Sequence, residues 1–269
     1  MTTELPGPAL LFCPADRPDR FAKAAAAADG VILDLEDGVA AEDRPRARAA
    51  LRETLLDPAR TLVRINPAGT EDHALDLAAL ADTPYDLVML AKTESAEQVR
   101  ALAPRPVLAL CETPAGVLAA PAIAAAANTA GLMWGAEDLL AALGGRSSRT
   151  ADGAYRPVAA HAAAAVLLAA GAYQRPAVDA VYLNIADLDG LTREARDAAD
   201  SGFAVKACIH PRQVEVVRAA FRPTPDEVAW AERVVAAAAD APGVFAFEGR
   251  MVDAPLLRHA EHILAHAAS

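Results

Sequence analysis

Apolar residues gather in eight short runs along the chain, each four to seven residues long. The runs occupy residues 9–13, 31–35, 61–65, 87–90, 107–111, 131–134, 180–183 and 203–209. Most are rich in Val, Ile and Leu, and apolar and polar residues do not alternate within them. Continuous apolar runs of this length are typical of strands buried on both faces of a parallel sheet.

Helical patterns fill the intervals between these runs. Helices are predicted over residues 20–28, 44–56, 71–80, 95–102, 113–127, 151–171 and 191–200, with two more over 225–239 and 254–268. Thr113 followed by Pro114 is typical of a helix start, because threonine caps the first turn and proline fits the first helical position.

The alternation of strand and helix predicts the fold. Eight strand–helix repeats are typical of a TIM (β/α)8 barrel, and an open doubly wound sheet is the alternative. The connection between Trp134 and Ala180 is the longest and is expected to carry extra helix or loop. No Gly- or Ser-rich linker interrupts the chain, so we expect one α/β domain over residues 1–269 with extra C-terminal helices.

Composition narrows the class of protein. Of the 269 residues, 54% are hydrophobic and 23% charged, which excludes a disordered chain. Roughly 70 residues are alanine, so many apolar positions are small helix formers rather than large core residues. The net charge of −11 argues against binding to nucleic acid or an anionic membrane, but a local basic cluster can still bind a small anionic substrate.

The termini and cysteines bear on the cellular compartment. The N-terminus lacks the basic start and apolar run of a signal peptide, and the apolar stretches are too short to span a bilayer. Cys13, Cys111 and Cys208 are odd in number and lie far apart in apolar runs, as expected of buried, reduced thiols. We therefore predict a cytoplasmic protein.

Polar residues follow seven of the eight predicted strands. The strand ends carry Asp34, Glu36, Asp37, Arg64, Asn66, Lys92, Glu112, Glu137, Asp138, Asn184 and His210. In a TIM barrel the carboxyl ends of the strands meet at one face, and active sites lie there. Convergent polar chemistry at so many strand ends predicts an active site rather than packing.

Two carboxylates at neighbouring strand ends predict a metal site. Glu112 and Asp138 follow the fifth and sixth runs, and a carboxylate pair with open positions suits Mg²⁺. The alternative is that they form structural ion pairs with Arg64 or Lys92, either of which can also hold a substrate carboxylate or enolate.

Weaker signals have structural alternatives. Arg17 and Lys23, near Arg20, could meet phosphates or simply lie on a solvated helix face. His210 is as consistent with a loop hydrogen bond as with an acid–base role. Residues 144–149 lack the Gly-Lys-Ser/Thr signature of a phosphate-binding loop, and we expect a mobile loop near the mouth of the site.

Six motifs in series resemble the citrate lyase beta-subunit-like proteins of the stand-alone actinobacterial type, within the superfamily of Mg²⁺-dependent HpcH/HpaI aldolases and malyl-CoA lyases. The motifs are LFCPADRPDRF (11–21), ILDLEDGV (32–39), VRIN (63–66), ETP (112–114), WGAEDL (134–139) and CIHP (208–211). The resemblance covers nearly the whole chain in order. Ala91 departs from the pattern, because many relatives have proline before the lysine that corresponds to Lys92.

The resemblance implies a TIM barrel that binds Mg²⁺ through Glu112 and Asp138. Arg64 would contact the oxo-acid part of the substrate. Glu36 and Asp37 would support Arg64 and the waters around the metal.

The resemblance also implies contacts with the rest of the substrate. The turn of Gly135, Ala136 and Glu137 would offer backbone N–H groups to the substrate carboxylate. Arg17 and Lys23 would lie near the nucleotide of coenzyme A (CoA).

A role in assembly is implied for the C-terminal segment, from about residue 225 to 269. It would pack on a neighbouring subunit of a homotrimer, where Asp253 would act as acid or base. Glu36 and a metal-bound water are the alternatives for the base, and the sequence does not choose among the three.

The activity implied is that of a Mg²⁺-dependent carbon–carbon lyase. It would cleave or form a β-hydroxyacyl-CoA thioester, giving an oxo acid or acetoacetate-type product and an acyl-CoA. Citryl, citramalyl, malyl and hydroxymethylglutaryl thioesters all fit this class. The alternatives are an aldolase or malate-synthase-like enzyme on free oxo acids, and a non-catalytic subunit of a citrate lyase complex. The chain is somewhat short for a subunit of that complex, which favours free CoA thioesters.

Overall fold

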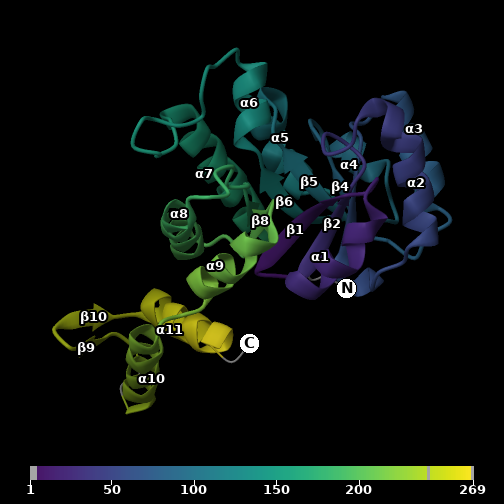
Figure 1. Ribbon diagram of the computed structural model, residues 1–269. Helices are drawn as coiled ribbons and strands as arrows, with labels where there is room; N and C mark the ends of the chain where they lie inside the picture. The colour runs from purple at the N-terminus through teal and green to yellow at the C-terminus, as the bar shows by residue number, and fades with distance from the viewer. Residues whose placement is uncertain (1–4, 241–242, 268–269) are drawn as a thin grey trace. The chain divides into compact units, whose positions relative to one another are not determined.

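The computed structural model describes residues 5–240 and 243–267, and its main feature is a closed barrel of eight parallel strands (Figure 1). The strands are β1 (Ala9–Pro14), β2 (Gly30–Asp34), β3 (Thr61–Ile65), β4 (Val88–Leu90), β5 (Val107–Cys111), β6 (Thr129–Trp134), β7 (Ala177–Asp179) and β8 (Val205–Cys208). Each strand pairs with the next, and the barrel closes where Leu10 of β1 lies opposite Ala207 of β8. This closure confirms the TIM barrel and excludes the open doubly wound sheet.

Helices follow the strands around the outside of the barrel (Figure 1). They are α1 (Phe21–Ala27), α2 (Arg44–Glu53), α3 (Glu71–Leu80), α4 (Ala96–Arg100), α5 (Pro114–Ala124), α6 (Ala136–Ala142), α7 (Pro157–Ala172), α8 (Leu188–Ser201) and α9 (Pro211–Phe221), with short 3-10 turns at Pro18–Arg20, Ala41–Asp43 and Pro58–Arg60. The helix start predicted at Thr113 is confirmed, because its side-chain oxygen accepts a hydrogen bond from the Gly116 backbone N–H at 3.0 Å.

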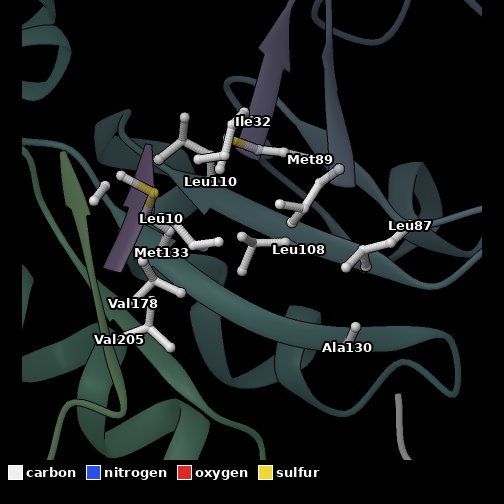
Figure 2. Packing of buried hydrophobic residues seen from close by; sticks show 12 residues of the cluster. Leu10, Ile32, Leu87, Met89, Leu108, Leu110, Ala130, Met133, Val178 and Val205 are labelled. Atoms are coloured by element: carbon white, nitrogen blue, oxygen red, sulfur yellow. The ribbon is translucent and has the colours of Figure 1, made fainter. Parts of the chain in front are cut away.

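Apolar side chains fill the barrel interior (Figure 2). The cluster includes Leu10, Ile32, Leu62, Met89, Leu108, Leu110, Met133, Val178 and Val205, so every strand contributes to it. Successive residues of a strand point to opposite faces. Asp179 and Lys206, which follow Val178 and Val205, therefore point out toward the helices. A packed interior leaves the mouths of the barrel as the places where a ligand can bind.

The described chain divides into two compact units, Met1–Val217 and Arg218–Ser269. The first contains the barrel. The second contains α10 (Pro225–Asp240), the antiparallel strands β9 (Phe245–Phe247) and β10 (Arg250–Val252), and α11 (Ala254–Ala267). Its own apolar core consists of Ala231, Val234, Val252, Ala260 and Ile263. Both predicted C-terminal helices are thereby confirmed, although residue 268 lies outside the described residues.

The seventh strand lies earlier than predicted. The apolar run 180–183 was expected to form it, but β7 ends at Asp179. The Asp179 carboxylate interrupts the apolar run, yet it is buried because Trp134 and Lys206 donate hydrogen bonds to it. Asn184 is consequently exposed beyond the strand rather than placed at its end.

Other differences concern connections. Helix α9 and the pair β9–β10 were not predicted, and residues 151–156 form a loop and turn before α7. The long sixth connection does carry the expected extra helix, α6. No helix among the described residues is long and apolar enough to cross a bilayer.

Candidate active site

A cavity of about 450 Å³ opens at the carboxyl ends of the barrel strands. Its polar wall consists of Asp34, Asp37, Arg64, Glu112, Glu137 and Asp138. Its apolar wall includes Phe12, Leu110, Met133, Trp134, Val181 and Ile209. Because carboxylates outnumber cations among the described lining residues, the cavity favours a positively charged occupant beside an anionic ligand.

Arg64 extends from β3 and is held by two carboxylates. Its Nε and Nη2 atoms each lie 2.6 Å from an oxygen of Asp34, and its Nη1 lies 3.1 Å from Oε2 of Glu36. The guanidinium stands 4.9 Å from the ring centre of Phe12. Burial alone would lower the pKa of Arg64, but Asp34 and Glu36 raise it above its ordinary value. Arg64 is therefore a fixed positive charge in the cavity.

The turn after β2 is built around the Asp34 carboxylate. Asp34 accepts hydrogen bonds from the backbone N–H groups of Glu36 at 3.0 Å and Gly38 at 2.9 Å. A Cβ atom on Gly38 would lie 2.2 Å from Oδ2 of Asp34, so only glycine allows the turn to close this tightly. The three acids of this turn have the basic partners that their crowding requires, in Arg64 and Lys92.

Lys92 brings the ends of three strands together. Its ammonium forms a short contact with Glu36 and lies 3.0 Å from Asp37 and 3.4 Å from Asp138. Burial opposes the charged form, but hydrogen bonds to Glu36 and Asp37 raise the pKa of Lys92 above its ordinary value. Its φ of +48° lies in the left-handed region, which non-glycine residues rarely adopt. Lys92 therefore neutralises carboxylates of the candidate site, in agreement with the ion-pair alternative.

Glu112 is a buried carboxylate at the end of β5, with 3% of its surface exposed. Its Oε1 accepts the Lys92 backbone N–H at 3.0 Å. Burial, and then the like charge of Asp138, raise the pKa of Glu112 to about 8. Glu112 is therefore a carboxylate whose charged form needs a nearby positive charge to stabilise it.

The site residues fit a divalent cation. A Cβ atom on Gly135 would lie 2.9 Å from Oε2 of Glu112, so the space beside that oxygen exists because residue 135 has no side chain. The described residues contain no group of three or more His, Cys, Asp or Glu side chains placed to hold a metal. A two-carboxylate set suits Mg²⁺, which completes its octahedron with water and substrate oxygens.

The start of α6 forms another part of the cavity wall. Gly135, the N-cap of the helix, and Ala136, Glu137 and Asp138 of its first turn all line it. The Glu137 carboxylate also accepts a hydrogen bond from the Ser148 hydroxyl at 2.6 Å. The Ser148 contact ties the loop of residues 143–156 to this turn.

Four predicted site residues lie outside the set that lines the cavity. Glu36 is buried and paired with Arg64 and Lys92. The Arg17 guanidinium pairs with Asp19 at 3.1 Å, and Lys23 is exposed on α1. Asp253 belongs to the second unit, where its Oδ1 accepts the Leu256 backbone N–H at 3.2 Å at the start of α11.

Sequence reasoning missed two features of the cavity. It did not separate Asp34 from the neighbouring acids, although only Asp34 forms the bidentate pair with Arg64. It also missed Phe12, which was part of an apolar run with nothing to mark it. Its position two residues before the end of β1 was the available signal.

Comparisons with known proteins agree with this geometry. Residues 9–211 match the family model for HpcH/HpaI aldolase/citrate lyase. The chain is 62% identical to the citrate lyase subunit beta-like protein of Mycobacterium tuberculosis, covering 99% of this chain and 98% of that one. It is 36% identical to a (3S)-malyl-CoA thioesterase of Cereibacter sphaeroides, and the match covers 96% of this chain and 93% of that one. It is 32% identical to the mitochondrial citramalyl-CoA lyase of Mus musculus, and the match covers 98% of this chain and 87% of that one.

A solved structure gives the same result for the fold. The protein CitE from Mycobacterium tuberculosis, in complex with magnesium, acetoacetate and coenzyme A, superposes with a TM-score of 0.96. The two chains share 62% identity over 98% of this chain and 99% of the other. On these matches, this chain is a carbon–carbon lyase and belongs to the HpcH/HpaI aldolase/citrate lyase family.

Proposed function

We propose that the protein is a Mg²⁺-dependent lyase that cleaves or forms a β-hydroxyacyl-CoA thioester, with an oxo acid and an acyl-CoA on the other side of the reaction. One observation carries the proposal. Glu112, Asp138 and Arg64, which come from three strand ends, face the same cavity. The complex of the M. tuberculosis relative with magnesium, acetoacetate and coenzyme A supports the same class of ligands.

Glu112 and Asp138 would hold the metal. When bound, Mg²⁺ supplies Lewis-acid charge next to the hydroxyl and carboxylate oxygens of the substrate. Arg64 adds a second positive charge, which stabilises the oxygens of the oxo acid as its carbonyl forms. The backbone N–H groups of Gly135, Ala136 and Glu137 would orient the substrate carboxylate.

Cleavage also needs a base for the hydroxyl proton and an acid for the departing thioester enolate. Glu36 is poorly suited as the base, because Lys92 and Arg64 engage its two oxygens. Asp37 lies beside Lys92 at the cavity wall and supports the charge balance there. We therefore favour Asp253, contributed by another copy of the chain, as the acid or base.

The remaining assignments belong to substrate binding and assembly. Arg17 and Lys23 would meet the CoA nucleotide. The C-terminal segment from about residue 225 would pack on a neighbouring subunit, and the assembly would be a homotrimer in the cytoplasm.

The test is turnover by the purified protein. Citryl-, citramalyl-, malyl- and hydroxymethylglutaryl-CoA are incubated separately, with Mg²⁺ and then with EDTA, and all products are quantified. The expected result is cleavage of at least one thioester into an oxo acid and an acyl-CoA, lost with EDTA. Glu112→Gln and Asp138→Asn should abolish this turnover while near-ultraviolet circular dichroism stays unchanged.

Other product patterns would contradict the proposal. Free CoA thiol with the intact hydroxy acid would indicate a thioesterase, the activity named for the C. sphaeroides relative. Turnover of free acids alone would indicate an aldolase of unactivated oxo acids. Absence of all turnover by a folded, Mg²⁺-binding protein would favour a subunit that needs a missing partner.

A further inference from the structure

Next to the cavity, six side chains form a connected set that we call the Lys206 network. Its members are Trp134, Arg149, Tyr155, Asp179, Glu194 and Lys206. They come from β6, β7, β8, α8 and the loop of residues 143–156. None of the six has been assigned a role in binding the metal or the substrate, although Trp134 lines the cavity.

Lys206 is fully buried at the centre of the network. Its ammonium donates to Oδ2 of Asp179 at 2.6 Å, to the Ala180 carbonyl at 2.7 Å and to Oε1 of Glu194 at 3.0 Å. An ammonium has three protons, so every donor is used. The cost of removing these charges from water offsets most of the energy gained from their attraction, so the buried ion pairs add little net stability. Their main effect is to fix the geometry of the side chains that they join.

On the cavity side, the network ends at Trp134. The second oxygen of Asp179 accepts the indole N–H of Trp134 at 2.7 Å. Trp134 is the last residue of β6, Gly135 is the N-cap of α6, and Asp138 lies in the first turn of that helix. Only three residues therefore separate Trp134 from Asp138.

On the loop side, the network ends at Arg149 and Tyr155. Arg149 donates to Oε2 of Glu194 at 2.6 Å, and the Tyr155 hydroxyl lies 3.3 Å from Oε1 of the same carboxylate. The Arg149 guanidinium stacks 3.9 Å from the ring centre of Tyr155. The Tyr155 ring in turn meets the Trp134 ring edge-on at 5.0 Å. The contacts thus form a closed circuit through the loop, the helix and the strands.

We propose that Arg149 and Tyr155 are positioning residues for the metal site. Through Glu194, Lys206 and Asp179 they fix Trp134, and Trp134 fixes the turn that carries Asp138. Docking of the 143–156 loop and binding of a divalent cation are then coupled. Two readouts test this proposal. The first, Mg²⁺ affinity, rests on the proposed function, whereas the second, the fluorescence of Trp134, does not.

The first readout is Mg²⁺ affinity, measured by calorimetry on the full chain. Arg149→Met removes a positive charge near a cation site, so simple electrostatics predicts tighter Mg²⁺ binding. Loss of positioning predicts the opposite, a dissociation constant raised roughly tenfold, as for other residues that orient metal ligands. Arg146→Met, an exposed position in the same loop, is the matched control and should show only the electrostatic effect.

The second readout is the fluorescence of Trp134. The chain has two tryptophans, so Trp230→Phe leaves Trp134 as the only emitter. In that background, Arg149→Met should increase quenching by acrylamide, whereas Arg146→Met should not. This measurement needs neither metal nor turnover, so it tests the network even if the proposed function is wrong.

Two further variants separate positioning from folding. Arg149→Lys keeps the charge that pairs with Glu194 and should restore part of the Mg²⁺ affinity. Tyr155→Leu removes the contact with Trp134 and should weaken Mg²⁺ binding and expose Trp134 in the same way. Wild-type Mg²⁺ affinity and wild-type quenching in both Arg149→Met and Tyr155→Leu would overturn the proposal, as would equal effects of Arg149→Met and Arg146→Met.

Discussion

At the scale of single residues, the chemistry of the cavity depends on which carboxylates have a cation beside them. Asp34 and Glu36 are held by Arg64, and Lys92 contacts Glu36, Asp37 and Asp138. Two carboxylates of the cavity wall have no ion pair among the described contacts. Glu137 accepts a hydrogen bond from the Ser148 hydroxyl, and Glu112 accepts one from a backbone N–H. The buried carboxylate that we assign to the metal is therefore one of the two that lack a cation partner.

Glu112→Gln should stabilise the metal-free protein at alkaline pH. The pKa of Glu112 rises from its ordinary 4.5 to about 8 on folding, through burial and then Asp138. Between these values the unfolded chain has lost the proton and the folded chain keeps it, so the free energy of unfolding falls as pH rises. The free energy of unfolding falls by at most about 1.4 kcal/mol per pH unit, and this fall ends near pH 8.

Thermal unfolding in EDTA from pH 5 to pH 9 checks this prediction. The melting temperature of the wild type should fall relative to Glu112→Gln as pH rises, and Mg²⁺ should restore only the wild type. A difference in melting temperature between the wild type and Glu112→Gln that stays constant from pH 5 to pH 9 would contradict the raised pKa of Glu112.

Arg64→Lys should cost activity. A lysine cannot form the paired Nε and Nη2 contacts with Asp34 and also reach Glu36, so the positive charge loses its fixed position. We expect kcat/KM to fall roughly 10²–10³-fold, as for loss of other fixed charge stabilisers. Steady-state kinetics measures this, with Arg52→Lys, in an exposed pair with Asp82, as the control. An Arg64→Lys enzyme within threefold of wild type would remove Arg64 from the reaction.

At the scale of elements, the turn after β2 depends on a glycine for steric reasons. Gly38→Ala would bring a Cβ atom to 2.2 Å from the Asp34 carboxylate, which Arg64 holds in place from the other side. We expect a lower melting temperature and weaker binding of oxo acids. Gly171→Ala, in α7 with open space around it, should leave both unchanged or raise the melting temperature slightly. Equal behaviour of the two variants in thermal unfolding and oxo-acid titration would show that the turn tolerates a side chain.

Most elements were predictable because their signals are local. Strands β3 and β5 and helix α3 have the predicted bounds, since apolar periodicity and end residues act within a few positions. Strand β7 was not predictable in this way. Its end is an aspartate whose burial depends on Lys206 of β8 and Trp134 of β6, partners distant in sequence.

The candidate site shows the same limit. Polar residues at the strand ends predicted that Arg64, Glu112 and Asp138 would converge, because a barrel brings all strand ends to one face. Which carboxylate pairs with which cation depends on side-chain reach across strands. The ammonium of Lys92 contacts three carboxylates from two other strand ends, and no sequence pattern specifies that choice.

At the scale of the whole molecule, two neighbouring helices contain no charged side chain. Helices α5 and α7 pack against each other and together contain no Asp, Glu, Lys or Arg. Leu118 and Leu168 on these helices are 82% and 73% exposed. Helices that are apolar on every side are normally buried. In a chain of net charge −11, two copies that meet through these helices bring no like charges of the helices together.

We therefore predict that this face contributes contacts to the proposed homotrimer, in addition to those proposed for the C-terminal segment. The wild type should have about three times the 27.9 kDa mass of the chain by light scattering. Leu118→Lys combined with Leu168→Lys should reduce that mass to that of a single chain, because each lysine would be buried without a partner at the contact. Leu75→Lys, on the charged helix α3, is the matched control and should leave the mass unchanged. A wild type that is monomeric at micromolar concentration would exclude the homotrimer. An unchanged mass for the double variant would show that the contacts between subunits lie on another face.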